Sequence, residues 1–537
     1  MKNWKISIVF FLFLTAGLAI VVRLADLQIR KGSLYEAMAS GQNFTVNTPV
    51  IKRGSIFLEN GEICLAQNKT RTFLYISSQK ISPPDVERIA ASLAPFLGLP
   101  ESELTTEIQK AGLLKKEILD GQADNAREYI KQQKFTSIWT EEISGRFYPY
   151  NALASQLLGF VNNEGAGQYG LESYYNSYLA GQEADIFLTI DYNLQYFAEK
   201  ALKQAKEQWN IDSGQIIVEE PSSGRIIALA NFPGFDGNKY GEESDLGVFI
   251  NSVTQKLFEP GSVFKPITMA AGLEERLVTP ETKYTDEGSV DVGGKPIYNF
   301  NKRVWGEQTM IDVLEESINT GVVFVEQKLG SQTFWRYIQN FGFLEKTDID
   351  LPGEVASANE GLKRGYPRDF AVASFGQGIM ITPIQLIRAF GAIANKGRMM
   401  QPYVVEKIVQ PNGQVALIRP KEVKQVISES TAAKLTAMLI SVVKNGAGRA
   451  AQISGYYITG KTGTAQVPVR GGGYSDTETI QSFIGYFPAL NPKYLVLIKL
   501  DNPKGIDSSG HSAAVVFHDV AKYIIDLKQI PPSPDAP

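Results

Sequence analysis

Three short groups of residues in the second half of this 537-residue chain have the types and spacing needed for acyl transfer. Ser262 and Lys265 stand three positions apart, so on a helix the hydroxyl and the amine share one face and the amine can take the serine proton. Pro260 and Gly261 predict a tight turn that places Ser262 near a helix N-terminus, where free backbone N–H groups stabilise an oxyanion. Pro266 restricts Lys265 and is tolerated only close to the helix start.

The second and third groups supply the proton chemistry that such a serine needs. Lysine is a poor base at its usual pKa of about 10.4, so the pKa of Lys265 must be lowered. Burial and a second cation both have this effect, and Lys461 is the available cation. Ser317 can relay a proton between Lys461 and a leaving amine. The predicted catalytic residues are therefore Ser262, Lys265, Ser317 and Lys461.

The neighbours of these residues suit a peptide substrate with a terminal carboxylate. Asn319 can hold a substrate amide, and the hydroxyls of Thr462 and Thr464 can bind the carboxylate beside the Lys461 charge. The backbone N–H groups of Ser262 and Thr464 are expected to form an oxyanion hole, in which one donor contributes about 3 kcal/mol to the transition state. The predicted substrate-binding residues are Asn319, Thr462, Gly463 and Thr464.

Each group is a weak signal alone, because S-x-x-K and S-x-N are common on polar helix faces and K-T-G is typical of a strand edge. The ordered triple is more specific, since S-x-x-K, S-D-N and K-T-G mark penicillin-binding proteins and class A β-lactamases. From about residue 23 to 525 the chain resembles class B penicillin-binding proteins. Further motifs that carry this resemblance are Arg53-Gly54-Ser55-Ile56, Gly170-Leu171-Glu172, Leu188-Thr189-Ile190-Asp191, Glu259-Pro260-Gly261-Ser262, Gly376-Gln377-Gly378 and Thr382-Pro383-Ile384-Gln385.

The resemblance implies a mixed α+β or α/β fold: a transpeptidase domain with a central antiparallel sheet between helical layers, on an elongated N-terminal pedestal. It implies that Ser262 attacks the penultimate D-Ala carbonyl of a peptidoglycan stem peptide, expels the terminal D-Ala and passes the acyl group to an amine on a neighbouring stem. β-Lactams are the implied inhibitors, and a membrane glycosyltransferase and division-complex proteins the implied partners. No cofactor or metal is implied.

Within the family, the sequence resembles the division and sporulation branch, and an elongation-type enzyme is the alternative. The resemblance to that branch rests on Glu259, on Asn319-Thr320-Gly321 and on the threonine of K-T-G. Leu58-Glu59-Asn60-Gly61 departs from the usual D-R-N-G and is expected to alter a pedestal contact. Ile318 stands where a small residue is commoner, which predicts a different pocket rim.

The helices and strands expected around the three groups predict one large domain. Its sheet is expected to combine strands from the beginning and the end of the domain's sequence. Strands expected at 215–219 and 225–230 are joined by a turn at 221–224, which is typical of a hairpin. Asp191 is a predicted N-cap for the helix that follows it. The other expected elements are helices at 193–208, 262–276, 309–330, 382–396 and 513–527, and strands at 456–459, 482–487 and 494–500.

The N-terminal part predicts an anchor and a pedestal. Residues 6–22 carry no charge, which is near the lower limit for crossing a bilayer, and Lys2 and Lys5 before them predict a cytoplasmic N-terminus. A cleaved signal peptide is the alternative. A short strand at 56–58 and a helical region at 83–134 are expected beyond it. The predicted units are a cytoplasmic segment 1–5, a transmembrane anchor 6–23, a pedestal 24–185, a transpeptidase domain 186–530 and a disordered tail 531–537.

Composition narrows the alternatives. A net charge of −4 argues against a nucleic-acid partner, and one cysteine and two histidines offer no metal cluster.

Residues 455–462 match the phosphate-binding pattern G-x-x-x-x-G-K-[ST], but no helix is expected to open at the lysine. A β-lactamase or β-lactam sensor and a non-catalytic division scaffold remain the rival hypotheses. His511 and Cys64 are interpreted as packing or surface residues.

Overall fold

The computed structural model describes residues 52–77, 81–135, 137–469 and 473–536, together with helical residues 11, 12, 14, 15 and 17. The predicted segment 1–5, most of the predicted anchor 6–23 and the first part of the predicted pedestal lie outside the described residues. Within the described ranges, no helix combines the length and the apolar character needed to span a membrane.

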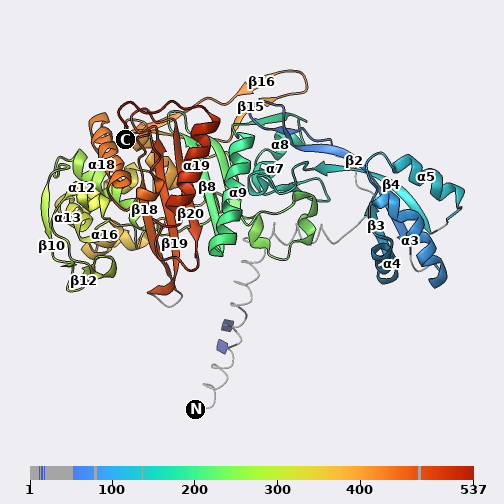
Figure 1. The fold of residues 1–537 in the computed structure, drawn as a ribbon, viewed down its shortest axis with the longest axis horizontal. Coiled ribbons are helices and arrows are strands. Elements are labelled where there is room, and N and C mark those ends of the chain that lie inside the picture. Colours follow the sequence, from blue (N-terminus) through green and yellow to red (C-terminus); the bar gives the residue numbers. More distant parts are fainter. Residues whose placement is uncertain are drawn as a thin grey trace, which may run out of the picture.

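The C-terminal part is built on a five-stranded antiparallel sheet in the order β18-β19-β20-β8-β9 (Figure 1). The predicted hairpin and the predicted completion of one sheet from both ends of the segment are therefore confirmed. The predicted strand 456–459 is wrong: Gly455 has a φ of +81° and turns the chain, so β18 begins only at Lys461. The strands are β8 (Ser213–Glu220), β9 (Arg225–Phe232), β18 (Lys461–Pro468), β19 (Tyr474–Phe487) and β20 (Tyr494–Asp501).

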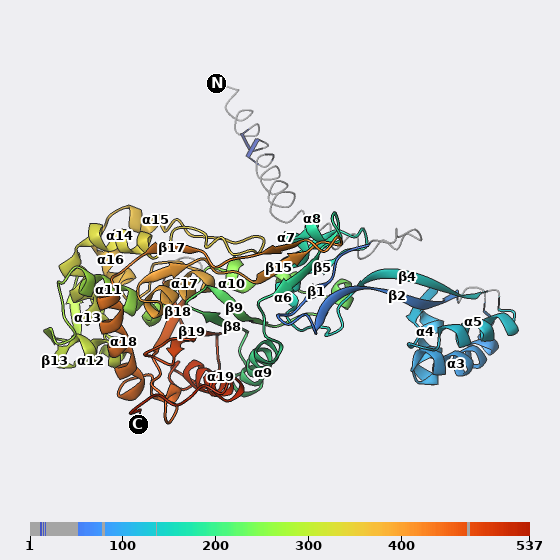
Figure 2. The same cartoon turned by 90° about the horizontal axis from the view of Figure 1, so that it is seen from above.

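Helices cover both faces of this sheet, as Figure 2 shows. The helices α9 (Tyr192–Trp209) and α19 (Ala513–Leu527) pack on one face. The opposite face is covered by α11 (Lys265–Glu274), α17 (Pro383–Ala394) and α18 (Glu429–Lys444). The predicted N-cap of α9 is confirmed, because the Asp191 carboxylate accepts hydrogen bonds from the backbone N–H groups of Asn193 and Leu194.

The helix predicted at 309–330 is wrong as one element. It is divided into α12 (Met310–Glu315) and α13 (Asn319–Leu329). Ser317 between them has a φ of +57°, and Ile318 is extended, so neither can continue a right-handed helix. Ile318 is buried in the core and does not reach the cavity described below.

The N-terminal part contributes five strands to a second, seven-stranded sheet, and β15 and β16 come from the C-terminal half. The two longest strands of this sheet reach away from the body and carry three helices at their far end (Figures 1 and 2). The region predicted as helical at 83–134 contains all three helices, but it also contains β3. The strands are β1 (Ile56–Phe57), β2 (Cys64–Ser77), β3 (Leu113–Glu117), β4 (Ile138–Phe147), β7 (Asp185–Leu188), β15 (Val405–Val409) and β16 (Val415–Leu417). The helices are α3 (Pro83–Leu97), α4 (Glu101–Lys110) and α5 (Ala123–Gln132).

Two features join this part to the body. β7 contains the predicted boundary at residues 185 and 186, and it pairs with β15 from the C-terminal half. Glu59, at the motif that departs from D-R-N-G, pairs with Arg225 of β9 at 2.8 Å. The altered residue thus makes a contact between the pedestal and the central sheet.

A buried ionic cluster holds the base of the long strands. The fully buried Glu172 carboxylate accepts hydrogen bonds from Arg53 Nε and Arg146 Nε, each at 2.6 Å. Arg53 also donates to Asn176 Oδ1 at 2.7 Å. Two motifs that the sequence separates by more than a hundred residues therefore meet in one network.

The C-terminal tail, which its proline content predicts to be disordered, makes hydrogen bonds with the segment before β18. Ser533 N donates to Gly455 O at 2.9 Å, and Tyr457 Oη donates to Asp535 O at 2.7 Å.

Candidate active site

Ser262 lies in a short 3-10 helix, η5 (Gly261–Phe264), that leads directly into α11. Gly261 has a φ of +60° and its N–H donates to Gly376 O at 2.9 Å, which holds the turn. Pro266 stands at the second position of α11, where no intrahelical donor is lost. The sequence requirement that this proline lie close to a helix start is therefore met.

Two buried lysines converge on Ser317. Lys265 Nζ donates to Ser317 O and, at 3.2 Å, to Ser317 Oγ. Lys461 Nζ donates to the same Oγ at 2.9 Å and to Thr462 O at 3.0 Å. Both lysines are 0% exposed, whereas Ser317 is half-buried. Ser317 Oγ therefore links the amino groups of two lysines that lie far apart in the sequence.

Burial perturbs the protonation of both lysines. The pKa of Lys265 lies well below its ordinary value, first because of desolvation and second because of the nearby Lys461 charge. Desolvation lowers the pKa of Lys461 to about 7. A lysine in this environment can lose its proton near neutral pH, which a surface lysine cannot do.

Ser262 is half-buried at the cavity, and its hydroxyl makes no hydrogen bond with any residue that the structure describes. The hydrogen bond expected between the Ser262 hydroxyl and the Lys265 amine is absent from the described residues, because this amine donates to Ser317 instead. In unliganded sites such contacts often form only when substrate binds.

The K-T-G group lies on β18, at the edge of the central sheet. Every second side chain of this strand points to the same face. On that face Thr462, Thr464 and Gln466 line the cavity. Gly463 faces the nucleophile turn, where a Cβ would lie 2.8 Å from Val263 Cγ1. Only glycine lets the strand pass this close to η5.

The other two substrate-binding predictions fall on the same cavity. Asn319 begins α13, and its Nδ2 donates to Tyr298 O at 3.0 Å. Thr464 Oγ1 lies 3.1 Å from Ser509 Oγ and accepts a hydrogen bond from Ser509 N at 3.1 Å.

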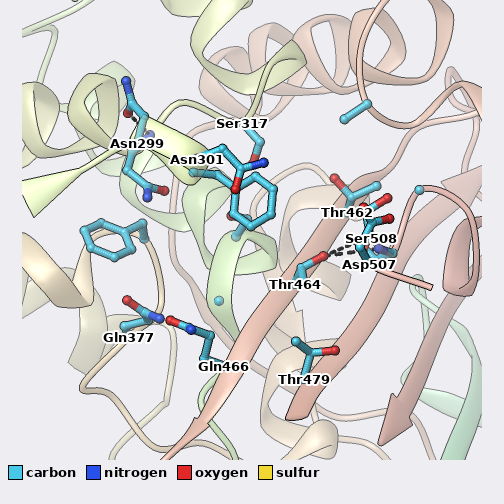
Figure 3. A pocket seen from close by; sticks show the side chains of 18 of the residues that line it. Asn299, Asn301, Ser317, Gln377, Thr462, Thr464, Gln466, Thr479, Asp507 and Ser508 are labelled. Carbon is cyan, nitrogen blue, oxygen red and sulfur yellow. Dashed lines mark hydrogen bonds between the residues drawn. The ribbon is translucent and has the colours of Figure 1, made fainter. Parts of the chain in front are cut away.

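The cavity has a volume of about 1600 Å³, and Figure 3 shows Ser317 on one side of it with Thr462 and Thr464 on the other. Its lining includes Ser262, Ser317, Asn319, Thr462 and Thr464. Lys265 and Lys461 are buried behind this wall. The structure thus brings all eight predicted site residues together.

Sequence reasoning missed further residues that line the cavity. Gln377 belongs to a motif that was noted for its resemblance to the family, so a signal for it existed. The cavity residues on loops gave no such signal in the sequence, because their positions follow neither a periodic pattern nor a motif. The missed residues include Tyr298, Phe300, Gln377, Gln466, Ser508 and His511.

The phosphate-loop pattern at 455–462 is excluded by its surroundings. Lys461 begins a strand, whereas that motif needs a helix opening at its lysine.

Known proteins share this architecture. A family model described as "Penicillin binding protein transpeptidase domain" matches residues 214–522, and one described as "Penicillin-binding Protein dimerisation domain" matches residues 49–207. Stage V sporulation protein D of Bacillus subtilis is 31% identical over 94% of this chain and 83% of its own length. A peptidoglycan D,D-transpeptidase FtsI homolog of Mesostigma viride is 29% identical, covering 98% and 96%. The crystal structure of penicillin-binding protein 3 from Mycobacterium tuberculosis, complexed with ampicillin, superposes with a TM-score of 0.72 at 27% identity, covering 90% of this chain and 96% of that one.

Proposed function

The chain belongs to the class B penicillin-binding proteins, with sporulation and division enzymes among its relatives, and we propose that it cross-links peptidoglycan stem peptides through an acyl-enzyme on Ser262. The observation that carries the proposal is Ser317 Oγ, which lies 3.2 Å from Lys265 Nζ and 2.9 Å from Lys461 Nζ beside the half-exposed serine. A relay of this kind serves both halves of an acyl transfer.

In the acylation half, Ser262 Oγ attacks the carbonyl of the penultimate D-Ala and gives its proton to neutral Lys265. The lowered pKa of Lys265 supports this role as base. The C–N bond then breaks, and the departing D-Ala amine receives a proton through Ser317, which Lys461 resupplies. In the second half, an acceptor amine attacks the ester carbonyl and loses a proton through Ser317 to Lys461. The ester C–O bond then breaks, and Ser262 Oγ takes back the proton that Lys265 has held.

The donor peptide is proposed to lie along the free edge of β18. An edge strand presents unpaired backbone groups that an extended peptide can meet. Thr462 and Thr464, with the charge of Lys461 behind them, are placed to bind the terminal carboxylate. Asn319 Nδ2 is already held by Tyr298 O, so its Oδ1 is proposed to accept from a substrate amide.

The proposal also covers the domains, the membrane topology and the partners of the protein. A pedestal at 24–185 and a transpeptidase domain at 186–530 are proposed. The family matches at 49–207 and 214–522 support two such units in this order. A single-pass anchor at 6–23 with a cytoplasmic N-terminus and an extracytoplasmic catalytic domain is supported by the uncharged run that follows Lys2 and Lys5. A membrane glycosyltransferase and division-complex proteins are the proposed partners, supported by the long reach of the pedestal.

The test is labelling of the full-length protein with a fluorescent penicillin, compared with Ser262→Ala. Stable labelling that is lost in the variant is the expected result. Label that forms and rapidly disappears would instead indicate a β-lactamase. A well-folded protein that takes no label would contradict the acyl-enzyme and leave a scaffold role.

A further inference from the structure

Asp286 is a buried carboxylate that takes no part in the acyl-transfer steps. It ends β10 (Lys283–Asp286), is 1% exposed and does not line the cavity. Its Oδ1 accepts a hydrogen bond from Thr320 Oγ1 at 2.6 Å, and its Oδ2 accepts from Trp305 N at 2.8 Å. Asn299 Nδ2 donates to both oxygens, each at 2.9 Å. Burial of a carboxylate is costly without such donors, so this network favours aspartate at the position.

Asn299 connects this carboxylate to the start of helix α13. Because its Nδ2 donates to Asp286, its Oδ1 is free to accept from the backbone N–H groups of Asn319 and Thr320, each at 3.1 Å. These two residues open α13, and Ile318 before them provides no side-chain cap. The first N–H groups of a helix need a partner from outside the helix, and here the partner comes from a segment 20 residues earlier in the chain. Asp286 thus fixes which end of the Asn299 amide faces the helix.

The first turn of α13 decides where the hydroxyl of Ser317 lies. Ser317 stands two residues before Asn319 and has a φ of +57°, a conformation that costs a non-glycine residue free energy. Such a conformation persists only where the surroundings over-determine it. The cap from Asn299 and the bond between Thr320 and Asp286 supply this restraint on the side of the helix.

We propose that Asp286 is a positioning residue for the acyl transfer, which acts through Asn299 and the first turn of α13 to hold Ser317 Oγ between the two lysines. The inference rests on the proposed function, in which Ser317 is the proton relay. The relay distances are 3.2 Å to Lys265 Nζ and 2.9 Å to Lys461 Nζ, so a small displacement of Ser317 breaks one of these hydrogen bonds. A misplacement of about 1 Å at a reacting centre can lower a rate about 10²-fold.

The experiment uses Asp286→Asn, which keeps the shape of the side chain but replaces one acceptor oxygen with an amide donor. The second-order rate constant of acylation by benzylpenicillin is measured by intact-protein mass spectrometry, on the full-length protein in detergent. With the β-lactam in excess, a loss of folded protein lowers the labelled fraction but not this rate constant. The variant is expected to be acylated about 10–100-fold more slowly than the original protein.

A double-mutant cycle separates positioning from a merely structural role. In a protein that already carries Ser317→Ala, the relay is lost, so Asp286→Asn should lower the rate constant by only about threefold or less. A residue that only supports the fold would lower the rate constant by the same factor in both backgrounds.

Asp350→Asn is the matched control. Its carboxylate also accepts two backbone N–H groups and a tyrosine hydroxyl, and it does not line the cavity. This variant should have a lower thermal midpoint and an unchanged rate constant. If Asp286→Asn does not fold, Asn299→Ala tests the same connection, because it removes the cap of α13 and leaves Asp286 bonded to Thr320 and Trp305.

Two results would overturn the positioning role alone: a rate constant of Asp286→Asn within about threefold of the original, or an equal loss with and without the Ser317 hydroxyl. A well-folded original protein that is not acylated at all would overturn the proposed function, and the positioning role with it.

Discussion

Removal of the Ser317 hydroxyl tests the proton relay most directly. In the structure this oxygen accepts hydrogen bonds from Lys265 at 3.2 Å and from Lys461 at 2.9 Å. Ser317→Ala deletes both contacts but keeps the backbone carbonyl that also holds Lys265. Alanine tolerates the φ of +57° about as poorly as serine does, so the backbone is expected to keep its course.

The expected magnitude follows from the chemistry. A positioned acid or base contributes about 10²–10⁴-fold to a rate, which corresponds to about 3–5 kcal/mol in the activation barrier. Loss of a half-buried hydroxyl that sits at a cavity wall should lower the free energy of unfolding by only about 1 kcal/mol. The variant should therefore be folded and slow.

The assay is the acylation rate constant with a β-lactam, measured together with the thermal midpoint. Ser144→Ala is a matched control, because Ser144 Oγ makes a hydrogen bond with Thr70 on the distant pedestal. An acylation rate of Ser317→Ala within about threefold of the original would refute the relay. A low rate accompanied by an unfolded protein would be answered with Ser317→Gly, which also lacks the hydroxyl but accepts the positive φ without strain.

Three further predictions concern buried charges. Lys461→Met should abolish acylation yet raise the thermal midpoint at pH 7. The reason is that the lysine keeps its proton up to about pH 10 in the unfolded chain, whereas its pKa in the folded protein is about 7. The rise in the midpoint should shrink as the pH approaches 10, and a rise that is independent of pH would contradict this account. Glu219 is 2% exposed, and one of its carboxylate oxygens has no hydrogen-bond partner among the described residues. Desolvation raises the pKa of this carboxyl well above its ordinary value. The folded protein therefore loses stability as the pH rises above the unfolded pKa of about 4.5. Glu219→Gln should raise the midpoint at pH 7 and not at pH 4, and calorimetry at both values decides. Glu172→Ala should lower the free energy of unfolding by about 3–5 kcal/mol, since Arg53 and Arg146 would be left buried without their partner; a loss below 1 kcal/mol in denaturant melts would argue against this cluster as a support of the pedestal.

Local rules were sufficient wherever neighbouring residues decide the structure. The hairpin of β8 and β9 followed from strand formers around a Pro-Ser-Ser-Gly turn. The start of α9 followed from the capping carboxylate of Asp191, and the limits of α19 followed from its apolar spacing. The residues proposed for the site were selected from their types and order, because acyl transfer needs a nucleophile, amines and hydroxyls in a limited set of spacings, and the structure places them at one cavity.

Elements that depend on distant contacts were missed. The helix predicted at 309–330 is interrupted at Ser317, whose carbonyl meets Lys265 from another helix. The strand predicted at 456–459 is a turn whose residues hydrogen-bond with the C-terminal tail. In both cases strong local propensity was overridden by tertiary contacts.

The sequence by itself determined which reactive groups are present: the serine and lysine of S-x-x-K, a second serine, a second lysine and the K-T-G triplet. The structure added that K-T-G lies on the edge strand β18. Only the tertiary structure decided that both lysines are fully buried and share one oxygen, and desolvation is what lowers their pKa values. It alone also placed Phe300 in the cavity, because the anchor at Asn299 joins segments of the chain that no periodic pattern connects. Burial and long-range hydrogen bonds are properties of the packed chain, and no local spacing encodes them.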